Sequence, residues 1–147
     1  MDKNTDFLGD KVKITPTSLT ISQLFSSKNE QFFIPAYQRR YSWGLKQLRD
    51  LFDDIDFLKG NDNHLLGSIV CLTESHVVGV NTLELVDGQQ RITSLSILMK
   101  AIRNMFTEMN NAENISEING YLSCKGIDGK FKNKLLLGDL DNPDYIK

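Results

Sequence analysis

A run of polar residues stands where an apolar, β-branched segment gives way to the longest helical pattern of the chain. The stretch VDGQQRITSL, residues 86–95, holds in succession Asp87, Gly88, Gln89, Gln90 and Arg91. The amides of a first helical turn point outward and, with the helix dipole, favour an anion. An arginine in that turn opposes the dipole, so its position makes sense if an anion binds. The stretch therefore indicates a phosphate or nucleotide site.

A helix cap explains part of the same stretch without a ligand. Asp87 and Gln90 have the spacing of a capping box, in which the carboxylate accepts from first-turn amides and the glutamine reaches back. Such a cap contributes about 1 kcal/mol. It leaves Arg91 unexplained, and Gly88 permits a tight turn and a close approach to a ligand. In the anion-site interpretation, Asp87 orients Arg91, bonds a sugar hydroxyl or holds a metal through water.

A second stretch, IPAYQRRYSW at residues 34–43, interleaves aromatic and basic side chains. Arg39 beside Gln38 suits a ligand loop, because a guanidinium pairs with phosphate oxygens in a bidentate way. A surface loop whose aromatic residues anchor it to the core is the alternative. The residue types alone are consistent with both.

Apolar periodicity predicts the elements that position these stretches. Helices are expected over residues 20–28, 43–59, 89–109 and 114–124, and strands over 32–34, 64–73, 82–86 and 134–137. Thr20 and Ser42 are the expected caps of the first two helices. The 64–73 strand is nearly all apolar, so both of its faces should be covered, and it should pair antiparallel with the next strand. Gly67 within it indicates a bulge or a close backbone approach.

The predicted 43–59 helix carries an acidic face with Asp53, Asp54 and Asp56. A solvated face is one interpretation, and a carboxylate for a nucleotide-bound Mg²⁺ is the other. A third possibility, that the domain itself cleaves DNA, would also need these aspartates as metal ligands. The sequence offers no second group of carboxylates to complete such a site. The sequence contains neither a phosphate loop nor a dinucleotide fingerprint, and Cys71 and Cys124 match no metal or redox spacing.

Composition narrows the class of protein. The chain has 147 residues, 40% hydrophobic and 24% charged, with a net charge of −2. These values are ordinary for one globular domain. No apolar run approaches the roughly 20 residues of a membrane span, and the first residues lack a secretory h-region. We therefore expect a cytoplasmic protein without a membrane partner. The C-terminal residues look unlike a natural end, which suggests a fragment of a longer protein.

Three blocks in this order, residues 34–43, 64–70 and 84–95, resemble the N-terminal domain of GmrSD-type restriction proteins, formerly a domain of unknown function. The resemblance implies a compact α+β fold of the ParB/sulfiredoxin-like type, with a small sheet, two amphipathic helices packed on it and the start of a helical region. The domains would be a flexible segment at 1–17, a ParB-like nucleotide-binding domain at 18–110 and a truncated helical extension at 111–147.

The resemblance also implies a function: an NTP-binding and NTP-hydrolysing regulatory domain, with Mg²⁺, in restriction of phage carrying modified DNA. DNA would be contacted through the full-length protein, and a C-terminal nuclease domain would be missing from this chain. A non-enzymatic module that senses DNA or its modification is the alternative. The implied catalytic residues are Asp87 and Arg91. The implied nucleotide-binding residues are Tyr37, Gln38, Arg39, Gly88, Gln89, Gln90, Arg91 and Thr93.

Two features depart from related patterns. Ile92, Thr93 and Ser94 replace the Leu and Thr pair that commonly follows the family's arginine, which preserves the hydroxyls. Sulfiredoxin carries Gly-Cys-His-Arg in the equivalent turn, whereas this chain has Gln89 and Gln90 there. Phosphoryl transfer through a thiol is therefore not expected, and the fragment contains no nuclease active site.

Overall fold

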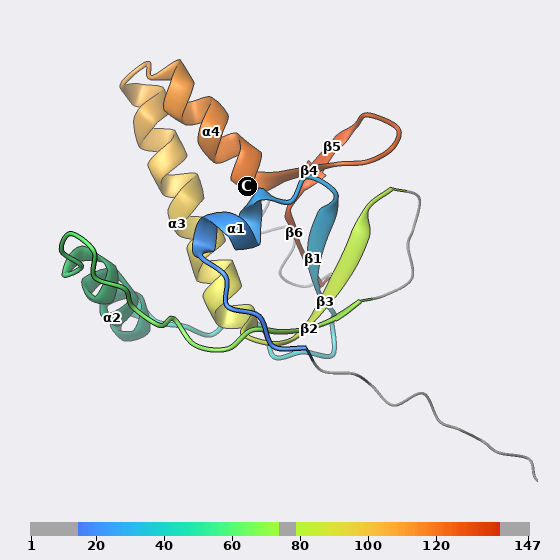
Figure 1. Cartoon of the computed structure of the whole chain (residues 1–147), viewed down its shortest axis with the longest axis horizontal. Coiled ribbons are helices and arrows are strands. Elements are labelled where there is room, and N and C mark those ends of the chain that lie inside the picture. Colours follow the sequence, from blue (N-terminus) through green and yellow to red (C-terminus); the bar gives the residue numbers. More distant parts are fainter. Residues whose placement is uncertain (1–14, 74–78, 139–147) are drawn as a thin grey trace, which may run out of the picture.

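The computed structural model describes residues 15–73 and 79–138, which form a mixed α+β arrangement (Figure 1). Within these ranges one four-stranded sheet has the order β2-β3-β1-β6. Its strands are β1 (Glu30–Ile34), β2 (Val70–Thr73), β3 (Asn81–Asp87) and β6 (Leu135–Leu137). Strand β1 runs parallel to both β3 and β6, and β2 runs antiparallel to β3. The α+β class and the antiparallel pairing of β2 with β3 are thus confirmed.

Four helices occur in the described residues: α1 (Ile21–Ser26), α2 (Leu45–Asp56), α3 (Gln89–Glu108) and α4 (Ala112–Leu122). Helices α3 and α4 form an antiparallel pair, and a separate hairpin of β4 (Ser123–Lys125) and β5 (Phe131–Asn133) follows α4 (Figure 1). No helix in the described part of the chain is both long and apolar enough to cross a membrane.

The core lies between the sheet and helices α1 and α3. Its buried members are Phe25, Phe32, Ile34, Leu85, Ile92, Leu95, Leu135 and Leu137. The rings of Phe25 and Phe32 meet edge to face with centroids 5.8 Å apart, a favoured aromatic geometry. Strand β6 supplies two core leucines, so residues beyond 110 contribute to the central sheet.

Lys134 is a cationic residue placed inside this core, with 1% of its surface exposed. Its ammonium group donates to the carbonyl oxygen of Ser27, at the end of α1. Burial lowers the pKa of Lys134, an effect that the neighbouring Cys124 and Glu30 oppose. Burial likewise raises the pKa of the Cys124 thiol. The buried ammonium ties the start of β6 to α1.

Three predicted features of the helices and strands are wrong in detail. Helix α2 begins at Leu45 with Gly44 as its N-cap, rather than at the expected Ser42 cap. Strand β2 spans only Val70–Thr73 and is mostly exposed, because it is an edge strand. Covering of both faces, expected from its apolar sequence, does not occur.

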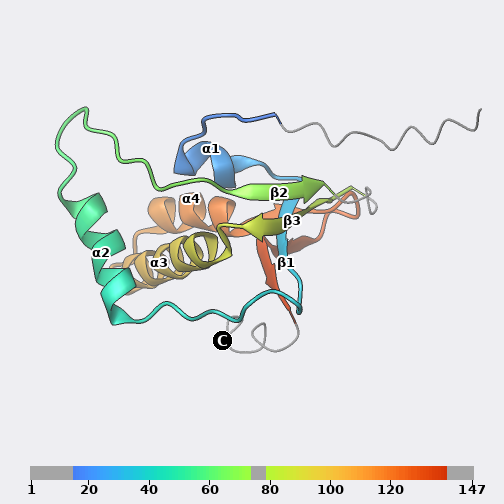
Figure 2. The same cartoon turned by 90° about the horizontal axis from the view of Figure 1, so that it is seen from below.

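Helix α2 is also not one of the helices that pack on the sheet. It stands on the far side of α3 from the sheet (Figures 1 and 2). Of its apolar stripe only Leu51 is buried, whereas Leu45 is 83% and Phe52 is 55% exposed. Helix α1 contributes Phe25 to the core instead, beside α3.

Candidate functional site

Gly88 makes the turn from β3 into α3. Its φ of 87° lies in the left-handed region, which glycine adopts without the penalty that other residues incur. A Cβ atom there would lie 2.9 Å from Ile69 Cγ1 and 3.2 Å from the Ser68 carbonyl oxygen. Both the turn and the close neighbours therefore require glycine. Gly88 itself is the N-cap of α3, with no side-chain cap, so the predicted capping box of Asp87 and Gln90 is wrong.

Gln90 does something other than capping: it binds the backbone of the 34–43 loop. Its Oε1 accepts from the Ser42 amide at 2.8 Å, and its Nε2 donates to the Arg40 carbonyl at 3.2 Å. The side chain is 7% exposed. One buried carboxamide thus satisfies a donor and an acceptor on either side of Tyr41, as a neighbouring β-strand would.

Two further bonds hold the loop on α3. The Tyr41 hydroxyl lies 2.9 Å from the Ser94 hydroxyl, one turn beyond Gln90. The Gln89 carboxamide donates to Gln38 Oε1 at 3.5 Å, a weak bond at the outer end of the loop. The interpretation of residues 34–43 as a loop anchored by its aromatics is therefore confirmed for Tyr41. Anchoring and ligand binding are compatible, because the anchors leave Arg39 exposed.

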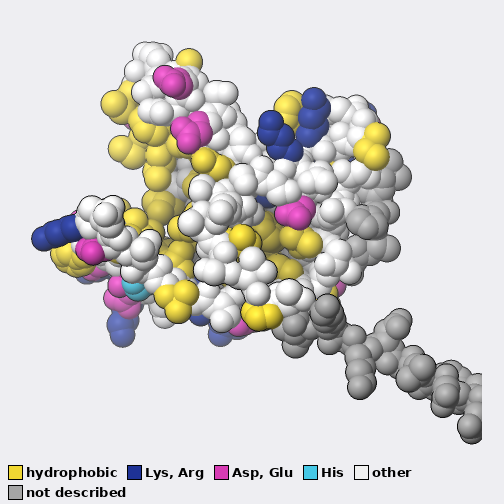
Figure 3. Space-filling model, viewed as in Figure 1, with side chains coloured by type: hydrophobic (Ala, Val, Ile, Leu, Met, Phe, Trp, Pro, Cys, Tyr) yellow, Lys and Arg dark blue, Asp and Glu magenta, His cyan; other side chains and the backbone are white. Residues whose placement is uncertain are grey.

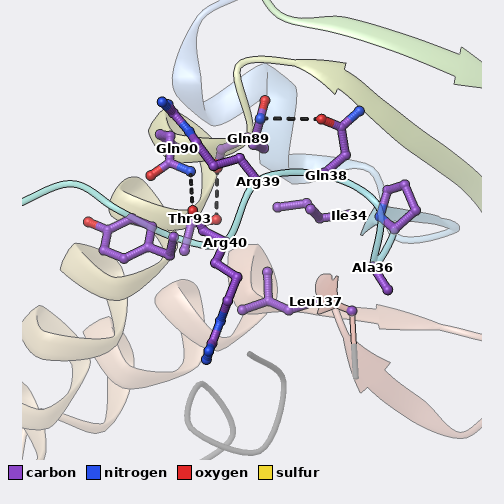
Figure 4. Close-up of a pocket in the computed structure, with 12 residues that line it drawn as sticks. Ile34, Ala36, Gln38, Arg39, Arg40, Gln89, Gln90, Thr93 and Leu137 are labelled. Atoms are coloured by element: carbon purple, nitrogen blue, oxygen red, sulfur yellow. Dashed lines mark hydrogen bonds between the residues drawn. The ribbon is translucent and has the colours of Figure 1, made fainter. Parts of the chain in front are cut away.

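A pocket lies between this anchored loop and the start of α3 (Figure 4). The space between its walls is about 380 Å³ when the open solvent at its mouth is included, so it is a shallow, open pocket. Its lining comes from the loop, from α3 and from the end of β6: Ile34, Pro35, Ala36, Gln38, Arg39, Arg40, Tyr41, Gln89, Gln90, Thr93, Leu137 and Gly138. A Cβ atom on Gly138 would lie 2.9 Å from Ala36 Cα, so the β6 end packs directly on the loop backbone.

The pocket is rich in hydrogen-bond donors. Arg39 and Arg40 both line it, and their guanidinium groups extend in opposite directions from the loop (Figure 4). Among the described residues, none pairs with the Arg39 guanidinium through a hydrogen bond or ion pair. The Thr93 hydroxyl donates to the Gln89 carbonyl at 2.7 Å and retains its acceptor capacity. Unpaired positive charge beside carboxamide groups suits an anionic oxygen ligand.

Arg91 and Asp87 lie outside this pocket. Successive residues of a helix are 100° apart, so Arg91 points about 200° away from Gln89. Its Nη1 donates to the Ser68 carbonyl oxygen at 2.8 Å. A Cβ atom on Gly67 would lie 2.9 Å from Arg91 Cζ, so the close backbone approach predicted at Gly67 is confirmed. The Asp87 carboxylate is exposed and, among the described residues, makes no hydrogen bond or ion pair.

Tyr37 sits on the rim and does not line the pocket. It is 74% exposed, and its hydroxyl donates to the Glu84 carboxylate of β3. The acidic face of α2 is also absent from the lining, and Asp54 lies 3.3 Å from His64 Nε2. In the described parts of the chain no three acidic, His or Cys groups gather as a metal site would require.

The structure therefore brings together five of the predicted nucleotide-binding residues, namely Gln38, Arg39, Gln89, Gln90 and Thr93. It also adds lining residues that the sequence did not indicate. Arg40 was predicted to contact DNA in the DNA-sensing alternative, but it was not among the predicted nucleotide-binding residues. Leu137 and Gly138 follow an apolar strand, and their role depends on β6 lying beside β1, which no local pattern reveals.

Comparison with known protein families identifies a match. The family described as "GmrSD restriction endonuclease, N-terminal domain" matches residues 21–144. No curated protein matches the chain. The matched range includes the anchored loop, the start of α3 and the β6 end, which are the three parts of the pocket. The chain belongs to the GmrSD restriction endonuclease N-terminal domain family.

Proposed function

We propose that the chain is a nucleotide-binding regulatory domain of a restriction protein, built as a ParB/sulfiredoxin-like domain. The observation that carries this proposal is the exposed, unpaired Arg39 held over a pocket at the N-terminal end of a 20-residue helix. The helix start contributes a positive field, and the guanidinium contributes a bidentate fork for phosphate. Family membership supports a role in restriction.

The pocket residues would divide the work of binding. Arg39 would hold phosphate oxygens, and Gln38 and Gln89 would supply neutral contacts to phosphate or sugar. Gln90 would act as a positioning residue, because both ends of its carboxamide are bonded to the loop backbone. The bond from Thr93 to the Gln89 carbonyl would fix the first turn of the helix.

Mg²⁺ would bind mainly through the phosphates of the proposed nucleotide, because no cluster of three acidic, His or Cys residues occurs in the described parts of the chain. This ion commonly binds through one or two carboxylates together with the phosphates of its nucleotide. Asp87, an exposed carboxylate at the β3 end that lies outside the pocket lining, would reach such an ion only through water. The ion would neutralise phosphate charge. For hydrolysis, the chain would contribute the orientation of the phosphates and further charge neutralisation while water attacks in line.

Arg91 is assigned a positioning role in this proposal rather than a ligand role. Its bond to Ser68 and its contact with Gly67 hold the segment that leads into β2. An Arg91→Ala variant separates the two roles. If Arg91 is a positioning residue, its replacement should lower the melting temperature of the ligand-free chain but leave the nucleotide-induced rise in place. Loss of that rise at an unchanged ligand-free melting temperature would assign Arg91 to the ligand.

A thermal-shift panel of nucleoside triphosphates, with and without Mg²⁺, tests the binding proposal. A ligand at a hundred times its Kd adds about 2.7 kcal/mol to stability, or roughly 5–10 °C for a domain of this size. We expect this rise in the parent chain and its loss in Arg39→Gln. Arg49→Gln, which removes an exposed arginine of α2, is the matched control and should keep the rise. A flat panel for the parent chain would overturn the proposal.

The alternative, a DNA-sensing module without nucleotide chemistry, rests on the adjacent exposed Arg39 and Arg40. It predicts duplex binding with a steep salt dependence that Arg39→Gln and Arg40→Gln both weaken. A flat nucleotide panel together with this result would favour the alternative.

A further inference from the structure

The β4–β5 hairpin is a short arm outside the main sheet whose surface is basic and apolar. All three residues of β5 are exposed, and the turn residue Ile127 is 76% exposed. In Figures 1 and 3 the hairpin projects away from α2 and α3, and lysine or arginine side chains gather over it. This concentration of positive charge contrasts with the net charge of −2 for the whole chain.

Backbone bonds make the arm a defined ribbon. The Gly126 amide donates to the Lys130 carbonyl and the Gly129 amide donates to the Gly126 carbonyl, each at 3.0 Å. Gly129 has a φ of 75°, the left-handed conformation that a tight turn needs. The Asp128 carboxylate accepts from the Lys130 amide at 3.1 Å. The one acidic residue of the turn is therefore engaged with the backbone.

Strand alternation gives the arm an inner and an outer face. Cys124, which is opposite Lys132, is buried. Lys125 and Phe131 are opposite each other in the next pair, so they share the outward face. The Lys125 ammonium lies 5.5 Å from the centroid of the Phe131 ring, although that ring is 74% exposed. An aromatic ring and an ammonium are thus presented together to solvent.

Exposed lysines lie on and beside the hairpin, although Lys132 shares the face of Cys124 and not that of Phe131. Lys125, Lys130 and Lys132 belong to the hairpin, and the Lys125 amide donates to the Lys28 carbonyl at 2.6 Å, which brings a fourth exposed lysine alongside. Four cations near one two-stranded ribbon are complementary in charge to the phosphate backbone of DNA. A two-stranded antiparallel ribbon is also an element that the major groove accommodates.

We propose that the β4–β5 arm binds the backbone of duplex DNA. The choice of DNA as the anionic partner rests on the proposed role in a restriction protein, whereas the site is separate from the nucleotide pocket. The lysines pair with phosphates, and Phe131 and Ile127 pack against the sugars or bases between them. Phosphate contacts from lysines position a protein on DNA without selecting sequence, so the arm acts as a general DNA contact.

Fluorescence anisotropy with a labelled duplex of roughly 20 base pairs tests the arm, with salt varied from about 50 to 200 mM. Removing one lysine–phosphate pair should reduce the slope of log affinity against log salt by about 0.9, which at 0.1 M corresponds to about eightfold in affinity. The triple variant Lys125→Gln/Lys130→Gln/Lys132→Gln should therefore bind at least eightfold more weakly, with a flatter slope. Circular dichroism verifies that the fold is retained.

The triple variant Lys46→Gln/Arg49→Gln/Lys59→Gln is the matched control, because it removes three exposed cations in or beside α2. Its affinity should fall less than twofold. Equal decreases in the two variants, or no duplex binding by the parent chain at the lowest salt, would overturn the proposal. So would tighter binding to anionic phospholipid vesicles than to duplex, with the same dependence on the arm lysines. Nucleotide thermal shifts should be unchanged in the arm variant, so the two proposals fail independently.

Discussion

Removing the Gln90 carboxamide tests whether this residue holds the 34–43 loop, which carries Arg39, against α3. Gln90→Met keeps a similar side-chain length but removes the bonds to the Ser42 amide and the Arg40 carbonyl. A typical hydrogen bond contributes about 1 kcal/mol. Since both partner residues are exposed, water replaces part of the loss, and we expect a decrease of about 1–2 kcal/mol.

Two measurements report on this change. Urea denaturation gives the free energy of unfolding, and amide hydrogen exchange reports directly on the Ser42 N–H, which should lose protection. Nucleotide affinity should fall as well, because the loop that carries Arg39 must be ordered on binding. Gln89→Met is the control for the stability measurement alone, because its bond to Gln38 is 3.5 Å long and its side chain is half-buried. In this control we expect the free energy of unfolding to fall by less than about 0.5 kcal/mol.

A Gln90→Glu variant sharpens the test. At neutral pH its carboxylate still accepts from Ser42 but cannot donate to Arg40, and it places a charge in a buried site. It should therefore be at least as destabilised as Gln90→Met at pH 7. Stability should recover as the pH falls and the new carboxyl becomes a donor. Unchanged Ser42 protection in Gln90→Met would refute the assignment of Gln90 as the residue that holds the loop on α3.

Three further predictions concern the core. Ser96→Ala should raise the free energy of unfolding by about 1 kcal/mol, measured in urea, because the Ser96 hydroxyl is buried without a hydrogen-bond partner among the described residues. Gly138→Ala should lower the free energy of unfolding by about 1–3 kcal/mol, since its Cβ atom would meet the Ala36 backbone. A lower melting temperature would report this loss. The lowered pKa of Lys134 means that the unfolded chain binds more protons as the pH approaches 10.5, so stability rises with pH in that window. This rise should be smaller in Lys134→Met, although Lys100, whose pKa burial also lowers, still contributes to it. Both chains are compared in a Cys124→Ala background to remove the titration of the thiol, and a rise of equal size in both would contradict the assignment.

Local patterns were sufficient for the elements that carry strong periodicity. Apolar residues three and four apart predicted α3, and its start and end agree within one residue. Thr20 was correctly predicted to cap α1, where Gln23 completes a capping box. These rules succeed because a cap or an amphipathic face depends on residues within one or two turns.

The same local rules failed at Gln90 because its partners are distant. Ser42 and Arg40 are 48 and 50 residues away in sequence, and they outcompete the reach back to residue 87. The Ser42 amide is bonded to Gln90, and α2 begins three residues later, at Leu45, with Gly44 as its N-cap. The capping pattern therefore predicted the start of α3 correctly, but it assigned the wrong partners to the Gln90 side chain.

The apolar sequence of the 64–73 segment misled for a related reason. Arg91 binds the backbone at Ser68, and Gly67 adopts a φ of 103°, so the segment is irregular before β2. Arg91 had seemed unexplained without an anion, and a backbone carbonyl supplies part of the explanation. The β6 pairing and the position of Gly138 depend on strand order, which single-strand patterns do not encode.

Strand β6 is synthesised late, so the central sheet is completed only near the end of translation of this chain. Phe32 of β1 pairs with Leu135 of β6, and the Gln31 side chain donates to the carbonyl oxygen of Asn133, 102 residues further on at the end of β5. At roughly 5–20 residues per second, the ribosome needs several seconds to deliver that partner. Until then the β1 edge that β6 will cover, with its apolar Phe32 and Ile34, presents unpaired backbone groups. The pocket, which the β6 end helps to line, is consequently one of the last parts of the molecule to form during synthesis, and any chain cut short before residue 135 would have an open sheet and an incomplete pocket.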